Sequence, residues 1–137
     1  MKHKLDRLSL EHEKLKIHQR LSRDEFKSDP FIADAACYSF IVAIQACVDL
    51  ASHIVAGLGL RHPKSNKELF EILAEENVSA PDFVDRLKGM VSFRNILTHR
   101  YWLVDIDKVY DALQNGLPDL AQFRQSIAEW IETQQDN

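Results

Sequence analysis

Six hydrogen-bonding side chains gather within eight positions of the segment SFRNILTHRYWLVD, residues 92–105. They are Arg94, Asn95, Thr98, His99, Arg100 and Tyr101. An arginine holds a phosphate through a planar fork of N–H donors, and a histidine takes or gives a proton near neutral pH. These two residue types are therefore suited to phosphate chemistry, with Arg94 binding the anion and His99 moving the proton. Such a set also occurs by chance on the solvated faces of ordinary helices.

The spacing of these residues predicts which of them can meet. On a regular helix, residues four apart share a face, whereas residues five apart differ by about 140°. Asn95 should therefore stack on His99 and orient one imidazole nitrogen, and Arg94 should share a face with Tyr101. Arg94 and His99 converge only if the helix loosens near Thr98 or Arg100, or if two such helices face each other across a dimer axis.

A second polar set lies on an otherwise apolar segment. Gln45, Asp49 and His53 recur every four residues, so that all three share one helix face. Asp49 can accept a hydrogen bond from His53, or from Arg94 if the two helices pack together. Because buried polar groups must find partners, the set predicts a mutually satisfied network. We assign Asp49 a supporting role only.

Several classes of site have no signature in the chain. Neither CxxC nor HExxH occurs, and no carboxylate pair flanks His99, so no metal ligand set and no cofactor is predicted. The phosphate-binding P-loop and the GxGxxG dinucleotide motif are also missing. The formal net charge is −4 and no basic run occurs, so a contact with nucleic acid would need a local basic cleft.

The composition indicates a cytoplasmic protein. The uncharged stretch from Ala35 to Val48 has fourteen residues, fewer than the roughly 18 to 20 that cross a bilayer, so no membrane span is expected. The charged first residues lack the apolar core of a secretory signal. Cys37 and Cys47 lie ten residues apart on one helix, about 15 Å along its axis, and cannot pair there. Two reduced, buried thiols are expected.

The hydrophobic pattern predicts an all-α fold. Apolar residues recur at helical spacing, and only four glycines and four prolines interrupt the 137 residues. We expect a single domain over residues 1–137, an up-and-down bundle of five or six helices. The expected helices span residues 2–23, 31–56, 67–77, 81 to at least 99, 107–113 and 118–131. Gly57 should provide a left-handed cap, and Ser65 with Glu68 should form a capping box.

The segment around Arg94 resembles a known motif. Arg94-Asn95, three residues, then His99-Arg100-Tyr101 is similar to the R-N-x-x-x-H-x-Y form of the R-x4-6-H motif of HEPN domains. The wider chain resembles the HepT branch of that superfamily, the toxin partners of minimal nucleotidyltransferase (MNT) antitoxins. The resemblance covers FKSDPFIADAACYSF, IQACVDLASHIVAGLGL, KELFEILAEENV, DRLKGMVSFRNILTHRYW and VDIDKVYDALQNGLPDLAQF.

The resemblance implies a HEPN helical bundle that forms a homodimer and cuts RNA without a metal ion. By position in the motif, Arg94 and His99 are the catalytic residues and Asn95 is the polar residue that commonly follows the arginine. Tyr101 matches the tyrosine that the cognate MNT-type nucleotidyltransferase antitoxin can modify with AMP from ATP. An anionic AMP group there would block substrate and repel its phosphates.

Elementary chemistry agrees with these implications. RNA carries its own nucleophile in the 2′-OH, so side chains suffice if they handle proton transfer and phosphate charge. One imidazole cannot easily act on both sides of a phosphorus, whereas two protomers supply two copies of His99. Two other functions stay open: a HEPN interaction or scaffold protein with little nuclease activity, and a nucleotide-binding subunit of a nucleotidyltransferase complex, with Arg94 holding a triphosphate.

Overall fold

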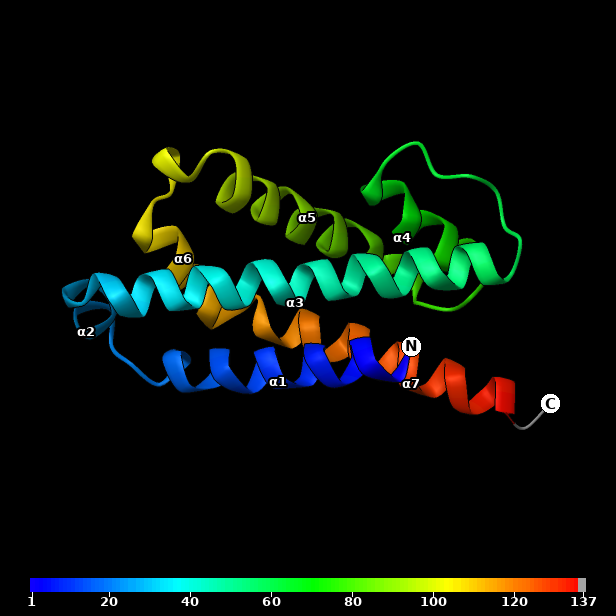
Figure 1. Ribbon diagram of the computed structural model, residues 1–137, viewed down its shortest axis with the longest axis horizontal. Helices are drawn as coiled ribbons and strands as arrows, with labels where there is room; N and C mark the ends of the chain where they lie inside the picture. The colour runs from blue at the N-terminus through cyan, green and yellow to red at the C-terminus, as the bar shows by residue number, and fades with distance from the viewer. Residues whose placement is uncertain (136–137) are drawn as a thin grey trace.

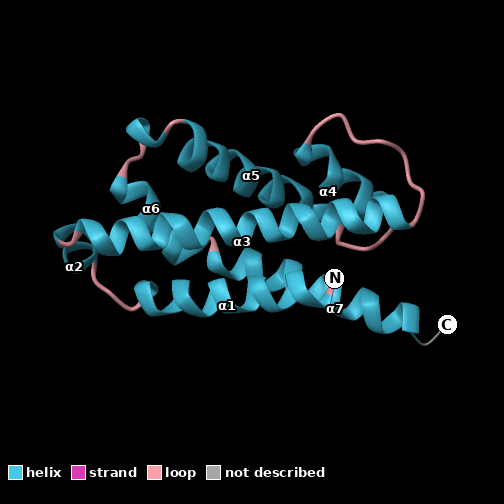
Figure 2. Cartoon of the chain, in the orientation of Figure 1, coloured by secondary structure: helices cyan, strands magenta, loops and turns pink. Residues whose placement is uncertain are grey.

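The chain folds into a bundle of helices around one long central helix (Figure 1), as a computed structural model shows for residues 1–135. The last two residues of the expected domain, 136 and 137, lie outside this range. The α-helices are α1 (Lys2–Gln19), α2 (Arg23–Ser28), α3 (Pro30–Gly57), α4 (Asn66–Glu75), α5 (Val84–His99), α6 (Ile106–Asn115) and α7 (Leu117–Gln135). Two short 3-10 helices are η1 (Pro81–Phe83) and η2 (Tyr101–Leu103). The expected all-α class is confirmed, and the described residues contain no strand (Figure 2).

Helix α3 forms the centre of the bundle. It runs between α1 and α7 on one side and α4 and α5 on the other, and its most extensive packing is against α1. Asp29 caps its start, because the side chain accepts a 2.9 Å hydrogen bond from the amide of Phe31, and Pro30 is its first residue. The buried face includes Phe40, Ile44 and Leu50. This helix therefore holds both the core and the residues of the polar set at 45 and 49.

Helix α3 is longer than the uncharged stretch within it. By length and apolar composition alone, its 28 residues would suffice to cross a membrane. Half of its most apolar window is nevertheless buried inside the bundle. Its apolar character is thus accounted for by its central place in the core.

Local capping corrects three expectations from the sequence. The first helix ends at Gln19 instead of Arg23, because Ser22 starts α2 through a capping box with Glu25. Gly57 is the last residue of α3, and the left-handed residue is Gly59, with φ of 65°. Ser65 does cap α4, but the Glu68 carboxylate turns to Arg61 and to the amide of Lys64, so the box is incomplete.

The two end helices of the described chain lie against each other. Helix α7 packs along α1, and the Nε2 atom of His12 lies 3.2 Å from the carbonyl oxygen of Leu117. The Gln19 amide donates to the carbonyl of Leu113 at 3.0 Å, and the Tyr110 hydroxyl donates to that of Leu21 at 2.7 Å. These contacts fix α1, whose first turn also reaches the candidate site.

Candidate functional site

The motif segment is divided by the end of a helix. Helix α5 stays regular through His99, and Arg100 leaves the helical region with φ −134° and ψ 42°. Tyr101 and Trp102 then lie in η2 with 71% and 67% of their surfaces exposed, and their rings meet edge to face at 5.3 Å. The expectation that Tyr101 shares a helix face with Arg94 is therefore wrong.

Arg94 is held by two neutral side chains. Its Nη2 group donates to Oε1 of Gln45 on α3, and its Nη1 group donates to Oδ1 of Asn95 at 3.0 Å. The Nε atom is buried and has no hydrogen-bond partner in the described chain. Arginine has five N–H donors, so these two bonds leave the buried Nε–H and one N–H on each Nη atom without a partner among the described residues. Asn95 thus contacts Arg94, and the structure shows no hydrogen bond from Asn95 to His99.

The polar set on α3 is connected differently from the expectation. Asp49 accepts a 2.8 Å hydrogen bond from Nε2 of Gln45 and pairs with Lys4 of α1 at 3.0 Å. Neither His53 nor Arg94 donates to Asp49 among the described residues, so both expected partners were wrong. His53 is exposed. Asp49 is linked to Arg94 only through the amide of Gln45.

His99 lies beside a surface hollow of about 460 Å³ at the end of α5. The hollow is lined by Ser92, Asn95, Ile96, His99 and Arg100. His99 is exposed, so its imidazole is accessible to a ligand. Arg94 does not line the hollow, because five residues of regular helix turn it towards α3. Asn95 lies at the hollow and bonds to Arg94, which makes it the link between the two.

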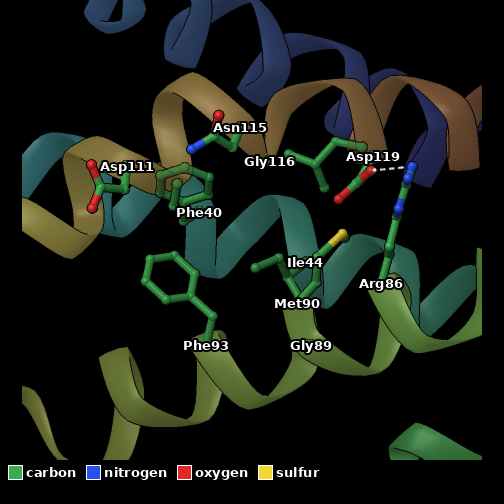
Figure 3. Close-up of a pocket in the computed structure, with 12 residues that line it drawn as sticks. Phe40, Ile44, Arg86, Gly89, Met90, Phe93, Asp111, Asn115, Gly116 and Asp119 are labelled. Carbon is green, nitrogen blue, oxygen red and sulfur yellow. Dashed lines mark ion pairs between the residues drawn. The ribbon is translucent and has the colours of Figure 1, made fainter.

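The apolar cavity of the molecule is on another side of α5 (Figure 3). It has a volume of about 350 Å³ between α3, α5 and the α6–α7 junction. Phe93 packs its ring edge to face on Phe40 there, with the ring centroids 5.2 Å apart. The Arg86–Asp119 ion pair, at 3.6 Å, closes one end, and burial raises the pKa of Asp119. This cavity shares no lining residue with the hollow at His99.

The structure also places the other groups with potential reactivity. Among residues 1–135, no three His, Cys, Asp or Glu side chains gather as metal ligands would. Cys37 and Cys47 are unpaired thiols; the former is half-buried and the latter buried. Burial, aided by the charge of Asp34, raises the pKa of Cys37 to about 11, and burial raises that of Cys47 further. Neither thiol belongs to the hollow at His99.

Sequence reasoning missed two members of the site. Gln45 was recognised as part of a polar set but not as the direct partner of Arg94. Lys4 carries no signal in the sequence, because its contact with Asp49 joins residues 45 positions apart. The four-residue spacing of 45 and 49 was the available clue to the Gln45–Asp49 bond.

Comparison with known proteins identifies relatives of this architecture. A model of the family described as "Ribonuclease HepT-like" matches residues 8–127. The mRNA nuclease HepT of Shewanella oneidensis is 34% identical over 99 residues, which are 72% of this chain and 74% of that protein. Putative RNase YutE of Bacillus subtilis is 26% identical over 91 residues, 66% and 63% of the two chains.

A solved structure has the same fold. The tri-AMPylated Shewanella oneidensis HEPN toxin, in complex with its MNT antitoxin, superposes with a TM-score of 0.84 and 28% identity. The alignment covers 93% of this chain and 95% of that one. The helical bundle is therefore shared over almost the full length of both proteins.

Proposed function

The chain belongs to the ribonuclease HepT-like family, and we propose that it cleaves RNA with Arg94 and His99 as its catalytic residues. The observation that carries this assignment is that Arg94 is held by hydrogen bonds while His99 is exposed. Arg94 is fixed by Gln45 and Asn95 while its Nε donor is left without a partner. His99 is exposed beside a hollow that a nucleotide can enter. A fixed cation and an accessible imidazole are what cleavage by an internal 2′-OH needs.

The reaction follows from the groups at the site. A neutral His99 takes the proton of the 2′-OH as its oxygen attacks the phosphorus, and the P–O5′ bond breaks. A protonated imidazole gives its proton to the leaving 5′ oxygen. The products are a 2′,3′-cyclic phosphate and a 5′-hydroxyl end. Arg94 offers its remaining N–H donors to the non-bridging oxygens, where negative charge accumulates in the transition state.

We infer that two protomers build the active cleft. Within one chain, Arg94 turns to α3 while His99 turns to the hollow, so a second copy would bring a second imidazole to the phosphate. The face of α3 that carries Gln45 also presents Phe31 and Tyr38, which are 82% and 58% exposed and lie at seven-residue spacing. Ile96 at the hollow is 43% exposed. An apolar face next to a polar site suits a homodimer interface.

We infer that the chain is the toxin of a toxin–antitoxin pair in the cytoplasm, with all 137 residues in one domain. A nucleotidyltransferase antitoxin is its expected partner, since the related toxin is described as AMPylated and bound to an MNT antitoxin. Tyr101 is the acceptor of AMP in this proposal. Its ring is 71% exposed on η2, directly after the helix that carries His99. A phosphodiester of AMP at that position would repel the phosphates of RNA.

Cleavage of a labelled RNA in the presence of EDTA tests the proposal. We expect the purified chain to leave a 2′,3′-cyclic phosphate, and Arg94→Ala and His99→Ala to lower kcat by at least about 100-fold. His53→Ala is the matched control, because that histidine is also exposed but lies outside the site. ATP binding without RNA cleavage would instead support a nucleotide-binding subunit, which the unused donors of Arg94 also fit. An intact chain without either activity would support an interaction protein.

A further inference from the structure

The side-chain amide of Gln45 lies between a cation and an anion. Its Oε1 atom accepts from Nη2 of Arg94, and its Nε2 group donates to Oδ1 of Asp49 at 2.8 Å. A guanidinium can only donate hydrogen bonds and a carboxylate can only accept them. Both partners therefore require the same orientation of the amide. Gln45 is half-buried in the middle of α3, which further restricts its rotamers.

The amide of Gln45 stands between Arg94 and the carboxylate of Asp49. Asp49 is the only acidic group joined to this network in the described chain, and it is paired with Lys4 at 3.0 Å. A carboxylate in direct contact with the guanidinium would offset much of the positive charge that attracts a phosphate. The bonds from Arg94 instead go to the neutral oxygens of Gln45 and Asn95. Arg94 is thus fixed in place by two acceptors and neutralised by neither.

We propose that Gln45 is a positioning residue that orients Arg94 and, as an uncharged spacer, keeps the negative charge of Asp49 off it. Lys4 completes the arrangement by balancing Asp49 from α1. The inference rests on the proposed ribonuclease function of Arg94 and His99. The inference gives Gln45, on α3, a role of its own, although Gln45 lines neither the hollow nor the place proposed for the scissile phosphate.

Two substitutions of Gln45 test its two proposed roles separately: orienting Arg94, and keeping negative charge away from it. Gln45→Leu removes the acceptor and should lower kcat/KM for RNA by about 10- to 100-fold, the usual effect of losing a hydrogen bond to a charged group. Gln45→Glu keeps the shape and an acceptor oxygen but puts a carboxylate on Arg94. It should lower kcat/KM at neutral pH at least as much as Gln45→Leu does. Gln122→Glu on the exposed part of α7 is the control for the added charge.

Repulsion between the new carboxylate and Asp49 is a competing cause of a defect in Gln45→Glu, because the groups would be neighbours. The double variant Gln45→Glu with Asp49→Asn removes this repulsion but leaves the charge on Arg94. We expect it to stay at least about 10-fold below wild type in kcat/KM. Recovery to wild-type activity would show that Arg94 tolerates a carboxylate, and would overturn the spacer role.

RNA binding gives a readout that a purely structural role would not change. In an uncleaving His99→Ala background, the slope of log Kd against log salt concentration counts the phosphates that the protein neutralises. Gln45→Glu should reduce this slope by about 0.7, one single-strand phosphate, whereas Gln45→Leu should leave it unchanged because the cation remains. Equal slopes in all three proteins would contradict the proposal.

Failure of this inference is distinguishable from failure of the proposed function. If wild type cleaves RNA and Arg94→Ala does not, but both Gln45 variants behave like wild type, only the role of Gln45 is wrong. If Arg94→Ala cleaves as well as wild type, the proposed catalytic role of Arg94 is wrong and the Gln45 role falls with it.

Discussion

Asn95 accepts a 3.0 Å hydrogen bond through its Oδ1 atom from Nη1 of Arg94, the residue directly before it. The same side chain lines the hollow in which His99 is exposed. Among residues 1–135, Asn95 is therefore the one that both hydrogen-bonds to Arg94 and lines the hollow at His99.

This contact predicts the effect of substitutions at position 95. Asn95→Ala removes one of the two acceptors that fix the guanidinium and should lower kcat for RNA cleavage by about 10-fold. Asn95→Asp restores the acceptor but adds a charge on Arg94, so KM for RNA should rise. Steady-state kinetics on a short RNA measures both, with the exposed Asn66→Ala on α4 as control. A wild-type kcat in Asn95→Ala would show that the bond from Asn95 is dispensable for orienting Arg94.

Exposure of η2 predicts where the antitoxin modifies the chain. With its nucleotidyltransferase, ATP and Mg²⁺, the wild-type chain should gain AMP on the peptide that contains Tyr101 and lose RNA cleavage. Tyr101→Phe should gain no AMP at this site, because it lacks the hydroxyl. Tyr38→Phe is the control, since it removes the hydroxyl of a different tyrosine, on α3, and should still gain AMP at Tyr101. Mass spectrometry of the digested protein locates the adduct. Full neutralisation with an unmodified Tyr101 would mean that the antitoxin inhibits by steric blocking.

The exposed apolar face of α3 predicts a requirement for two copies. Tyr38→Glu places a charge in the inferred interface, so the protein should sediment as a monomer and lose at least about 10-fold in RNA cleavage. Its helical circular dichroism should stay unchanged, because Tyr38 lies outside the core. Ile17→Glu is the control, an equally exposed apolar residue on α1 at 62%. A Tyr38→Glu protein that remains dimeric would locate the interface elsewhere.

The two thiols should differ from an ordinary cysteine in their pH dependence. The thiolate is the form that reacts with iodoacetamide, and burial together with Asp34 raises the pKa of Cys37 to about 11. Its alkylation rate should therefore rise about tenfold per pH unit from pH 7 to 10, without a plateau near the usual value. Cys47, buried and with a pKa raised further, should not react in the folded chain. Rates in wild type and Cys37→Ser check this, and a plateau by pH 9 would contradict it.

Two glycines should respond oppositely to the same substitution. At Gly89, in the middle of α5, an added Cβ meets nothing within 4 Å, so Gly89→Ala should stabilise the protein by about 0.5–1 kcal/mol. At Gly116 the added Cβ would lie 2.8 Å from the carbonyl oxygen of Ala112, so Gly116→Ala should destabilise it. Urea denaturation measures both free energies of unfolding. A destabilised Gly89→Ala would mean that the free space beside α5 closes in solution.

The sequence predicted which segments are helical better than it predicted the residues at which the helices end. Helices α3 and α5 follow from Asp29-Pro30, from Pro81 and from apolar periodicity, all of which act locally. The break at Ser22 was missed because the long apolar stripe of the first segment masked a capping box. Gly57 was expected to be the left-handed residue, whereas Gly59 is, because the helix continues through Gly57 and the sequence does not show how far it extends.

The sequence proposes residues for the site but did not predict how they are connected. Arg94 and His99 are proposed as catalytic from their resemblance to the HEPN motif, whereas the bond from Arg94 to Gln45 joins residues 49 positions apart and has no sequence motif. Asp49 was expected to bind His53 or Arg94, since helix spacing alone allows several partners within reach. Which partner is chosen depends on how α1, α3 and α5 pack, and Lys4 takes part only because α1 lies along α3.

The packing of α1 against α6 and α7 has a consequence for folding during synthesis. Helix α1 is synthesised before α6 and α7, yet its contacts through His12 and Gln19 are with residues 117 and 113 of these helices. The nascent chain thus carries α5, with Arg94 and His99, before α1 can make these contacts, although α1 can already pack on α3. The part of α1 that packs on α6 and α7 stays uncovered until then, so chaperone binding during translation would fall on this part.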